Sequence, residues 1–311
     1  MVDFRYHLVS IIAIFLALAV GIVVGTTALN GTVLDNLRGS ISSLSGDKRS
    51  LEGNVKDLRQ TVSKDDAFAT LVTPTLIKNQ LTGQKVLVVS TPDAPGELRD
   101  ALLKQVVGAG AEVTGQLRLK PDLLDPTKTS AVDDLVANLG PPTGAAPGSS
   151  AQRAGAELAN ALVRRSGAPA SGATAQKVLG GFTGAELLVV ETDVVQPTAT
   201  LVLVVTGPPP APTPDLRQRN AAAVAVAAAF GSRAGVVVVG PAGAAEAPSV
   251  LRVLRDDATL TGRVSSVDDA DSPFGRISTV FALHQQVAGS AGRYGTGHGA
   301  QAPAPTPTPS R

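Results

Sequence analysis

Aspartates gather in the C-terminal third of the sequence, where they could bind a divalent cation. They are Asp256, Asp257, Asp268, Asp269 and Asp271. Carboxylate oxygens are the ligands that Mg²⁺ and Ca²⁺ prefer, but this spacing is not that of an EF-hand loop. Asp271 or Ser272, followed by Pro273, also fits a helix N-cap with proline in the first turn. The pattern therefore favours capping and turn roles over a metal site.

Soft-metal and acid–base chemistry would depend on the histidines. They are His7, His284 and His298, far apart in sequence, and the chain has no cysteine and one methionine. Copper prefers thiolate, thioether and imidazole ligands, so His284 and His298 are only weak metal candidates and no cofactor is evident. His284 is also the only candidate general base, and no G-x-S-x-G nucleophile motif is present. We expect that the protein is not an enzyme.

Glycines after one apolar run could cradle a phosphate. Gly240 and Gly243 follow the segment GVVVV, but neither G-x-G-x-x-G nor a P-loop lysine motif is present. A tight turn after a strand is the favoured interpretation. The formal net charge of +1 and the lack of a basic stripe argue against nucleic acid as a partner.

The N-terminal segment from Leu8 to Leu29 has no charged residue. Its length corresponds to about 33 Å of helix at ~1.5 Å per residue, which matches a hydrocarbon core of about 30 Å. A secretory signal has a shorter apolar run and a small-residue cleavage site, so the sequence favours an uncleaved anchor in a lipid bilayer. Small residues recur at every fourth position of this segment, namely Ala13, Ala17, Gly21 and Gly25. They form either a helix-packing stripe or only the ordinary composition of a membrane helix.

The charges that flank the anchor suggest its orientation. Arg5 precedes the apolar run, and the first charged residue after it is Asp35. The positive-inside rule then predicts a single-pass protein with a cytoplasmic N-terminus and an extracytoplasmic bulk.

A heptad pattern follows the anchor and predicts a coiled-coil stalk. Its apolar positions form a dimer seam of Leu34, Leu37, Ile41, Leu44, Leu51, Val55, Leu58 and Val62. Lys48 interrupts the seam, either as a polar residue that sets the register or as a side chain at its edge. A lone helix would expose the seam, so we expect a partner, either a second copy in a parallel homodimer or another helix of the chain.

The sequence after the stalk predicts an α/β fold. Continuous apolar runs such as Lys85–Ser90 and Thr200–Gly207 alternate with helical patterns, as in parallel strands covered on both faces. We expect a Rossmann-like three-layer domain with a mostly parallel sheet. The predicted domains are the anchor at 1–30, the stalk at 31–66, an extracytoplasmic α/β domain at 67–292 with a flexible loop at 140–150, and a disordered proline-rich tail at 293–311.

Three stretches carry a family resemblance. The opening MVDFRYHLVSIIAIFLALAVGIVVGTTAL, the heptad stalk and the closing LTGRVSSVDDADSPFGRISTVFALHQQVAGSAGRYG together resemble the actinobacterial MctB family. The resemblance covers nearly the whole chain except the proline-rich tail. It implies a membrane protein of the cell envelope with a role in copper homeostasis and copper efflux, and it makes copper a possible ligand.

The same resemblance implies an alternative function. The family also includes SteB, a cell-separation protein that acts with a membrane partner, SteA. A non-enzymatic scaffold in cell separation and cell-wall integrity, with a SteA-like partner, is therefore the second hypothesis. The family label says outer membrane, but outer-membrane barrels have alternating strands and aromatic girdles that this sequence lacks.

Overall fold

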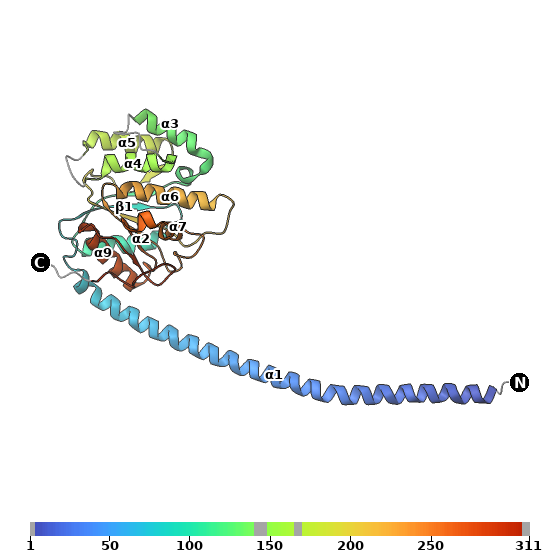
Figure 1. Cartoon of the computed structure of the whole chain (residues 1–311). Coiled ribbons are helices and arrows are strands. Elements are labelled where there is room, and N and C mark those ends of the chain that lie inside the picture. The colour runs from blue at the N-terminus through green and yellow to red at the C-terminus, as the bar shows by residue number, and fades with distance from the viewer. Residues whose placement is uncertain (1–3, 140–147, 165–169, 307–311) are drawn as a thin grey trace. The chain divides into compact units, whose positions relative to one another are not determined.

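The computed structural model describes residues 4–139, 148–164 and 170–306, with the backbone alone for 27–34. It divides into two compact units, Met1–Asp65 and Asp66–Arg311. The helix α1 (Phe4–Ile77) makes up the described part of the first unit, and its last turns belong to the second. Figure 1 shows the elements of both units.

The N-terminal part of α1 has the length and composition of a membrane-spanning helix. Phe4–Thr26 is strongly apolar and fully exposed within the protein. The hydroxyl of Thr26 donates to the carbonyl oxygen of Ile22 at 2.9 Å, so this polar group is satisfied inside the helix. A helix that satisfies polar groups internally in this way suits a bilayer.

A seven-stranded sheet forms the centre of the second unit, in the order β3-β2-β1-β4-β5-β6-β7. The strands are β1 (Lys85–Ser90), β2 (Glu112–Leu119), β3 (Leu188–Val190), β4 (Leu201–Val205), β5 (Gly235–Val239), β6 (Val264–Val267) and β7 (Arg293–Tyr294). All neighbouring pairs are parallel except β2 and β3, which are antiparallel. The predicted α/β class with a mostly parallel sheet is therefore confirmed.

Helices cover both faces of this sheet (Figure 1). One face packs against α4 (Ser150–Leu162), α6 (Leu216–Gly231) and α7 (Val250–Asp256), with α3 (Thr129–Leu139) and α5 (Gly172–Gly184) joining the same core. The other face packs against α2 (Gly96–Gly108), α9 (Pro273–Val287) and the last turns of α1. The short elements are the 3-10 helices η1 (Pro121–Leu124) and η2 (Pro126–Lys128) and the helix α8 (Ala258–Thr261).

Strand residues divide between the two cores by their alternation. Val202 and Val204 of β4 lie in the core beneath α4 and α6, whereas Leu201 and Leu203 lie in the core beneath α2 and α9. Because both faces are covered, both sets of side chains are apolar, which explains the continuous apolar runs in the sequence.

Two predicted boundaries differ from the bounds of the helices and strands in the structure. The tail at 293–311 is ordered as far as the structure describes it, because Arg293–Tyr294 forms β7 beside β6 and Tyr294 is 3% exposed. The loop predicted at 140–150 ends earlier, because the Ser149 side chain caps α4, which begins at Ser150. Residues 140–147 and 307–311 lie outside the described residues.

Candidate functional site

The heptad seam is an exposed apolar stripe on α1. The described seam residues are between 44% and 72% exposed: Leu37, Ile41, Leu44, Leu51, Val55, Leu58 and Val62. The side chain of Leu34 lies outside the described part of the structure. The stripe has the helical spacing that the sequence predicts, and its coiled-coil pairing stays a prediction.

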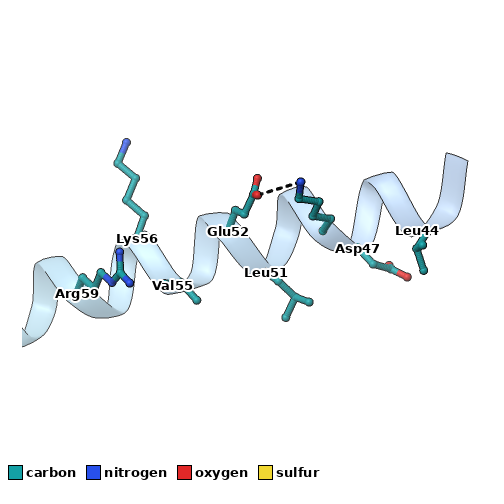
Figure 2. A pocket seen from close by; sticks show the side chains of 8 residues that line it. Leu44, Asp47, Leu51, Glu52, Val55, Lys56 and Arg59 are labelled. Carbon is teal, nitrogen blue, oxygen red and sulfur yellow. Dashed lines mark ion pairs between the residues drawn. The ribbon is translucent and has the colours of Figure 1, made fainter. Parts of the chain in front are cut away.

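Charged residues flank the apolar stripe on the same helix, among them Asp47, Glu52 and Lys56. Figure 2 shows Leu44, Leu51 and Val55 projecting to one side, with Glu52 and Lys56 on the opposite side. Lys48 pairs with Glu52 at 3.6 Å, one turn along. The hollow of about 540 Å³ drawn there is lined by α1 alone. A single helix face cannot enclose a small molecule, so this surface suits a helical partner.

Two members of the aspartate cluster, Asp257 and Asp271, serve caps and turns, which are the roles that the sequence favoured. Asp257 caps α8 by accepting from the Thr259 amide at 2.8 Å. Asp271 accepts from the Ala242 amide at 2.8 Å, and the predicted N-cap proves to be Ser272, which accepts from the Gly275 amide at 2.9 Å. Within the described residues, no group of three or more His, Asp or Glu side chains is placed to hold a metal ion.

Asp268 forms a buried ion pair with Arg255. The carboxylate and the guanidinium are 2.5 Å apart, and both side chains are 1% exposed. Asp268 also accepts from the Thr296 and Gly297 amides at 2.8 and 2.9 Å, while Arg255 donates to the Tyr294 carbonyl at 2.7 Å. The pair thus fastens residues 294–297 to the carboxyl end of β6, which accounts for the ordered segment.

Asp269 has a perturbed acidity. Burial, reinforced by the neighbouring Asp268 carboxylate, raises the pKa of Asp269 to about 6. Its Oδ1 atom is buried and, within the described ranges, has no hydrogen-bond partner. Its backbone carbonyl lies under Gly275, where a Cβ atom would come within 1.9 Å of the carbonyl oxygen.

The two histidine candidates have separate structural roles. The Nδ1 atom of His284 lies 2.7 Å from the Gln80 carbonyl oxygen, which ties α9 to the chain after α1. His298 is exposed, and its carbonyl accepts from Arg255 at 2.7 Å. Neither contact converges with other metal-ligating side chains in the described part of the chain.

The glycines after β5 form the expected tight turn. The Ala244 amide donates to the Pro241 carbonyl at 2.9 Å, and Gly243 has a φ of +81°. A Cβ atom at Gly240 would lie 2.5 Å from that of Ala244. The glycines thus serve the close packing of the turn.

A cavity of about 370 Å³ opens at the carboxyl ends of the central strands. It is lined by Thr91 and Pro92 after β1, Pro121 after β2, Pro210 after β4, Asn220 on α6 and Val250 on α7. The strand order reverses between β1 and β4, and such switch points are where open α/β sheets bind ligands. The sequence analysis missed this site, although the proline-rich loop after β4 marks one wall.

The polar groups of the cavity are mostly paired. Arg219 donates to Asp125 at 2.8 Å and also to Asp215. Hydrogen bonds from Thr127 and Thr213, respectively, hold the pKa values of Asp125 and Asp215 below their usual range. The exception is Asn220, whose Nδ2 atom is buried and has no hydrogen-bond partner in the described part of the chain.

Comparison with known proteins extends over both units. A family model described as "Copper transport outer membrane protein, MctB" matches residues 1–305. The chain belongs to the MctB family. It is 30% identical over 309 residues to "Copper transporter MctB" of Mycobacterium tuberculosis (strain ATCC 25618 / H37Rv), covering 96% of this chain and 98% of the relative. "Copper transporter MctB" of Mycobacterium leprae (strain TN) is 30% identical over 312 residues, with the same coverage.

The MctB match includes the anchor, the stalk and the α/β unit together. The family is described as a membrane copper-transport protein, and Phe4–Thr26 could cross a membrane by length and composition. The relatives are named as transporters, which agrees with a protein that is not an enzyme.

Proposed function

We propose that this MctB family member is a single-pass protein of the cell envelope that serves copper homeostasis through copper efflux. The observation that carries the proposal is the match over residues 1–305 to a copper-transport family. The apolar helix at Phe4–Thr26 would place it in the bilayer, with the N-terminus in the cytoplasm and the α/β unit outside.

Its part in copper handling is proposed to be indirect. One apolar helix cannot enclose an ion path, and intramembrane ionisable groups are the usual mark of such a path. Between Leu8 and Leu29 the sequence has none. The described residues also contain no cluster of three metal-ligating carboxylates or imidazoles. These observations favour a protein that assists other components over one that carries the ion itself.

A second candidate is a non-enzymatic scaffold for cell separation and cell-wall integrity. The exposed seam on α1 favours it, because an apolar stripe of this length suits a protein partner. A SteA-like membrane protein would be that partner. Copper sensitivity would then be a secondary consequence of a leaky envelope.

The stalk is proposed to form a parallel homodimer. In the heptad, Ile41, Val55 and Val62 occupy a positions, whereas leucines occupy the d positions. β-Branched residues at a with leucine at d favour two parallel strands. Anchoring in one membrane orients two copies in the same direction, which agrees with this preference.

The charges around Lys48 bear on the register of such a dimer. Lys48 is the polar a residue, Asp47 precedes it at g and Glu52 follows at e. In a parallel dimer, Asp47 of one copy approaches Glu52 of the other, and this contact alone is repulsive. Lys48 of each copy lies between these carboxylates, so it offsets the repulsion only when the two chains are in register.

Cysteine crosslinking of the full chain in lipid nanodiscs tests the stalk. Because the natural chain has no cysteine, Leu51→Cys at d introduces a single thiol. We expect a disulfide-linked dimer under mild oxidation, whereas Ser50→Cys at the outward c position crosslinks far less. Equal crosslinking of both variants, or none of either, contradicts a parallel seam. Replacing Leu51 and Leu58 with Ser should also weaken association in sedimentation experiments.

Deletion of the gene and complementation test the copper role. We expect the deletion strain to accumulate copper and to grow poorly in copper, with normal septation in copper-free medium. Chained or misshapen cells without copper accumulation would support the scaffold instead. Calorimetric titration of Cu(I) and Cu(II) into the full chain supplies the direct check. Tight binding that a His284→Ala/His298→Ala variant abolishes would overturn the indirect role.

A further inference from the structure

We propose that the cavity at the sheet switch point binds a small neutral ligand that combines an apolar ring or chain with a carbonyl-type hydrogen-bond acceptor. The cavity lies between the loops that follow β1 and β4, where the strand order reverses. Its volume of about 370 Å³ falls in the range of small-molecule sites, roughly 300–1,000 Å³.

The walls of the cavity are chiefly apolar. Pro92, Pro121, Pro210, Leu124 and Val250 contribute rings and aliphatic side chains from four separate segments. Such walls recognise the apolar part of a ligand by excluding water from it. The prolines also make the wall stiff, since the pyrrolidine ring fixes φ.

Asn220 supplies the specific polar contact. Its side chain lines the cavity and is 5% exposed, and its Nδ2 atom has no hydrogen-bond partner among the residues that the structure describes. A buried amide without a partner is unfavourable, so a ligand that accepts a hydrogen bond there is favoured. Nδ2 only donates, so the matching ligand group is an acceptor.

The charges around the cavity disfavour an anion. Asp93 and Asp215 line it together with one cation, Arg219. The guanidinium of Arg219 already binds the carboxylates of Asp215 and Asp125. A ligand carboxylate or phosphate would therefore meet two carboxylates and a cation whose charge is already compensated.

A nucleotide is excluded for a further reason, although dinucleotide-binding folds share this strand order. A phosphate site at the end of a strand requires free backbone N–H groups. Here Pro92 and Pro210 have none, and the Thr91 amide donates to the Val205 carbonyl at 2.9 Å. Thr91, Pro92 and Pro210 therefore offer a phosphate no free backbone donor.

Three isosteric probes separate these possibilities: benzamide is neutral with an acceptor, benzoate is anionic, and benzamidine is cationic without an acceptor. Ligand-observed saturation-transfer NMR of the full chain in lipid nanodiscs measures their binding. We expect benzamide to bind at least tenfold more tightly than benzoate and more tightly than benzamidine. Benzoate binding as tightly as benzamide would overturn the proposal, and so would the absence of benzamide binding.

Variants test whether benzamide binds in this cavity. Ala211 lines the cavity and is exposed, so Ala211→Phe fills the cavity without disturbing a core. It should abolish benzamide binding, whereas Ala173→Phe, an equally exposed alanine on α5, should leave it unchanged. Asn220→Leu removes the Nδ2 donor and should weaken benzamide binding at least fivefold. Unchanged benzamide binding in Ala211→Phe would show that the probe binds elsewhere and overturn the proposal.

Discussion

Leu51 and Leu203 have the same side chain but lie in contrasting surroundings. Leu51, in the heptad seam of α1, is 64% exposed, whereas Leu203, in β4, is fully buried. Around Leu203, neighbouring strands and the helices α2 and α9 supply apolar contacts from within the chain. Every described seam residue of α1 is exposed.

This difference separates a unit that completes its own core from one whose apolar residues stay exposed on a single helix. The second unit buries apolar residues on both faces of its sheet. The first unit presents a span suited to lipid, Phe4–Thr26, and then a stripe suited to another helix. We therefore expect its order to depend on the bilayer and on association, while the α/β unit depends on internal packing.

The largest expected effect is on the buried ion pair that completes the second unit. Arg255→Leu leaves the Asp268 carboxylate buried without its cation and releases the contacts to the Tyr294 and His298 carbonyls. Removing one partner of a buried pair costs about 3–5 kcal/mol. We expect this loss of unfolding free energy when guanidinium unfolding of the full chain is monitored by circular dichroism. Residues 293–306 should become exposed before the rest of the unit unfolds.

The matched control removes both charges. In Arg255→Leu/Asp268→Asn the uncompensated charge is gone, so part of the lost stability should return. If the double variant is less stable than Arg255→Leu, the hydrogen bonds of Asp268 to the Thr296 and Gly297 amides matter more than the charge.

A leucine-to-alanine pair tests the comparison directly. Leu203→Ala should lower the free energy of unfolding of the α/β unit by about 2–5 kcal/mol, because it creates a cavity in a packed core. Leu51→Ala should leave that free energy within about 0.5 kcal/mol and weaken self-association instead. Hydrogen exchange of β4 peptides and sedimentation of the full chain measure the two effects. Unchanged association in Leu51→Ala would show that the seam does not pair.

The sequence was informative wherever a pattern was local and repeated. The run from Leu201 to Val205 predicted a strand buried on both faces, and the motif at Ser272–Pro273 predicted the start of α9. The heptad predicted the continuous helix over the stalk. In each case, neighbours within a few residues determine the backbone conformation, so spacing was sufficient.

Features that join distant segments could not be predicted in the same way. The cavity combines Pro92, Pro210 and Val250, which only the strand order brings together. The segment after Arg293 has a composition typical of disorder, yet a buried arginine far upstream holds it. Asn220 resembles any polar helix residue until its burial is known. Such contacts depend on topology, which residue spacing does not specify.

A smaller effect, on pH dependence, is expected from Asp269. Its pKa in the folded protein is about 6, above the usual 3.8, so the folded state retains the proton while the unfolded state loses it. Stability should therefore fall as pH rises from about 4 to 6 and level off above 6. After discounting for solvent screening, we expect the free energy of unfolding to fall by about 1–2 kcal/mol over this range.

Asp269→Asn isolates this contribution. The amide cannot ionise, so the difference in unfolding free energy between variant and natural protein should grow in favour of the variant between pH 4 and 6. Guanidinium midpoints at several pH values measure it. A difference that is flat with pH contradicts the raised pKa of Asp269.

The smallest expected effect contrasts two glycines. Gly46 lies at the outward f position of the stalk helix, and a Cβ atom there would meet nothing within 4 Å. Gly46→Ala should therefore stabilise the helix by up to about 1 kcal/mol and leave crosslinking through Leu51→Cys unchanged. Gly83, in the second unit, has equal space but a φ of +75°, so Gly83→Ala should destabilise by roughly 1 kcal/mol. Helix content on heating and guanidinium unfolding measure the pair. Weaker crosslinking in Gly46→Ala would place that glycine in the contact and shift the seam away from Leu51.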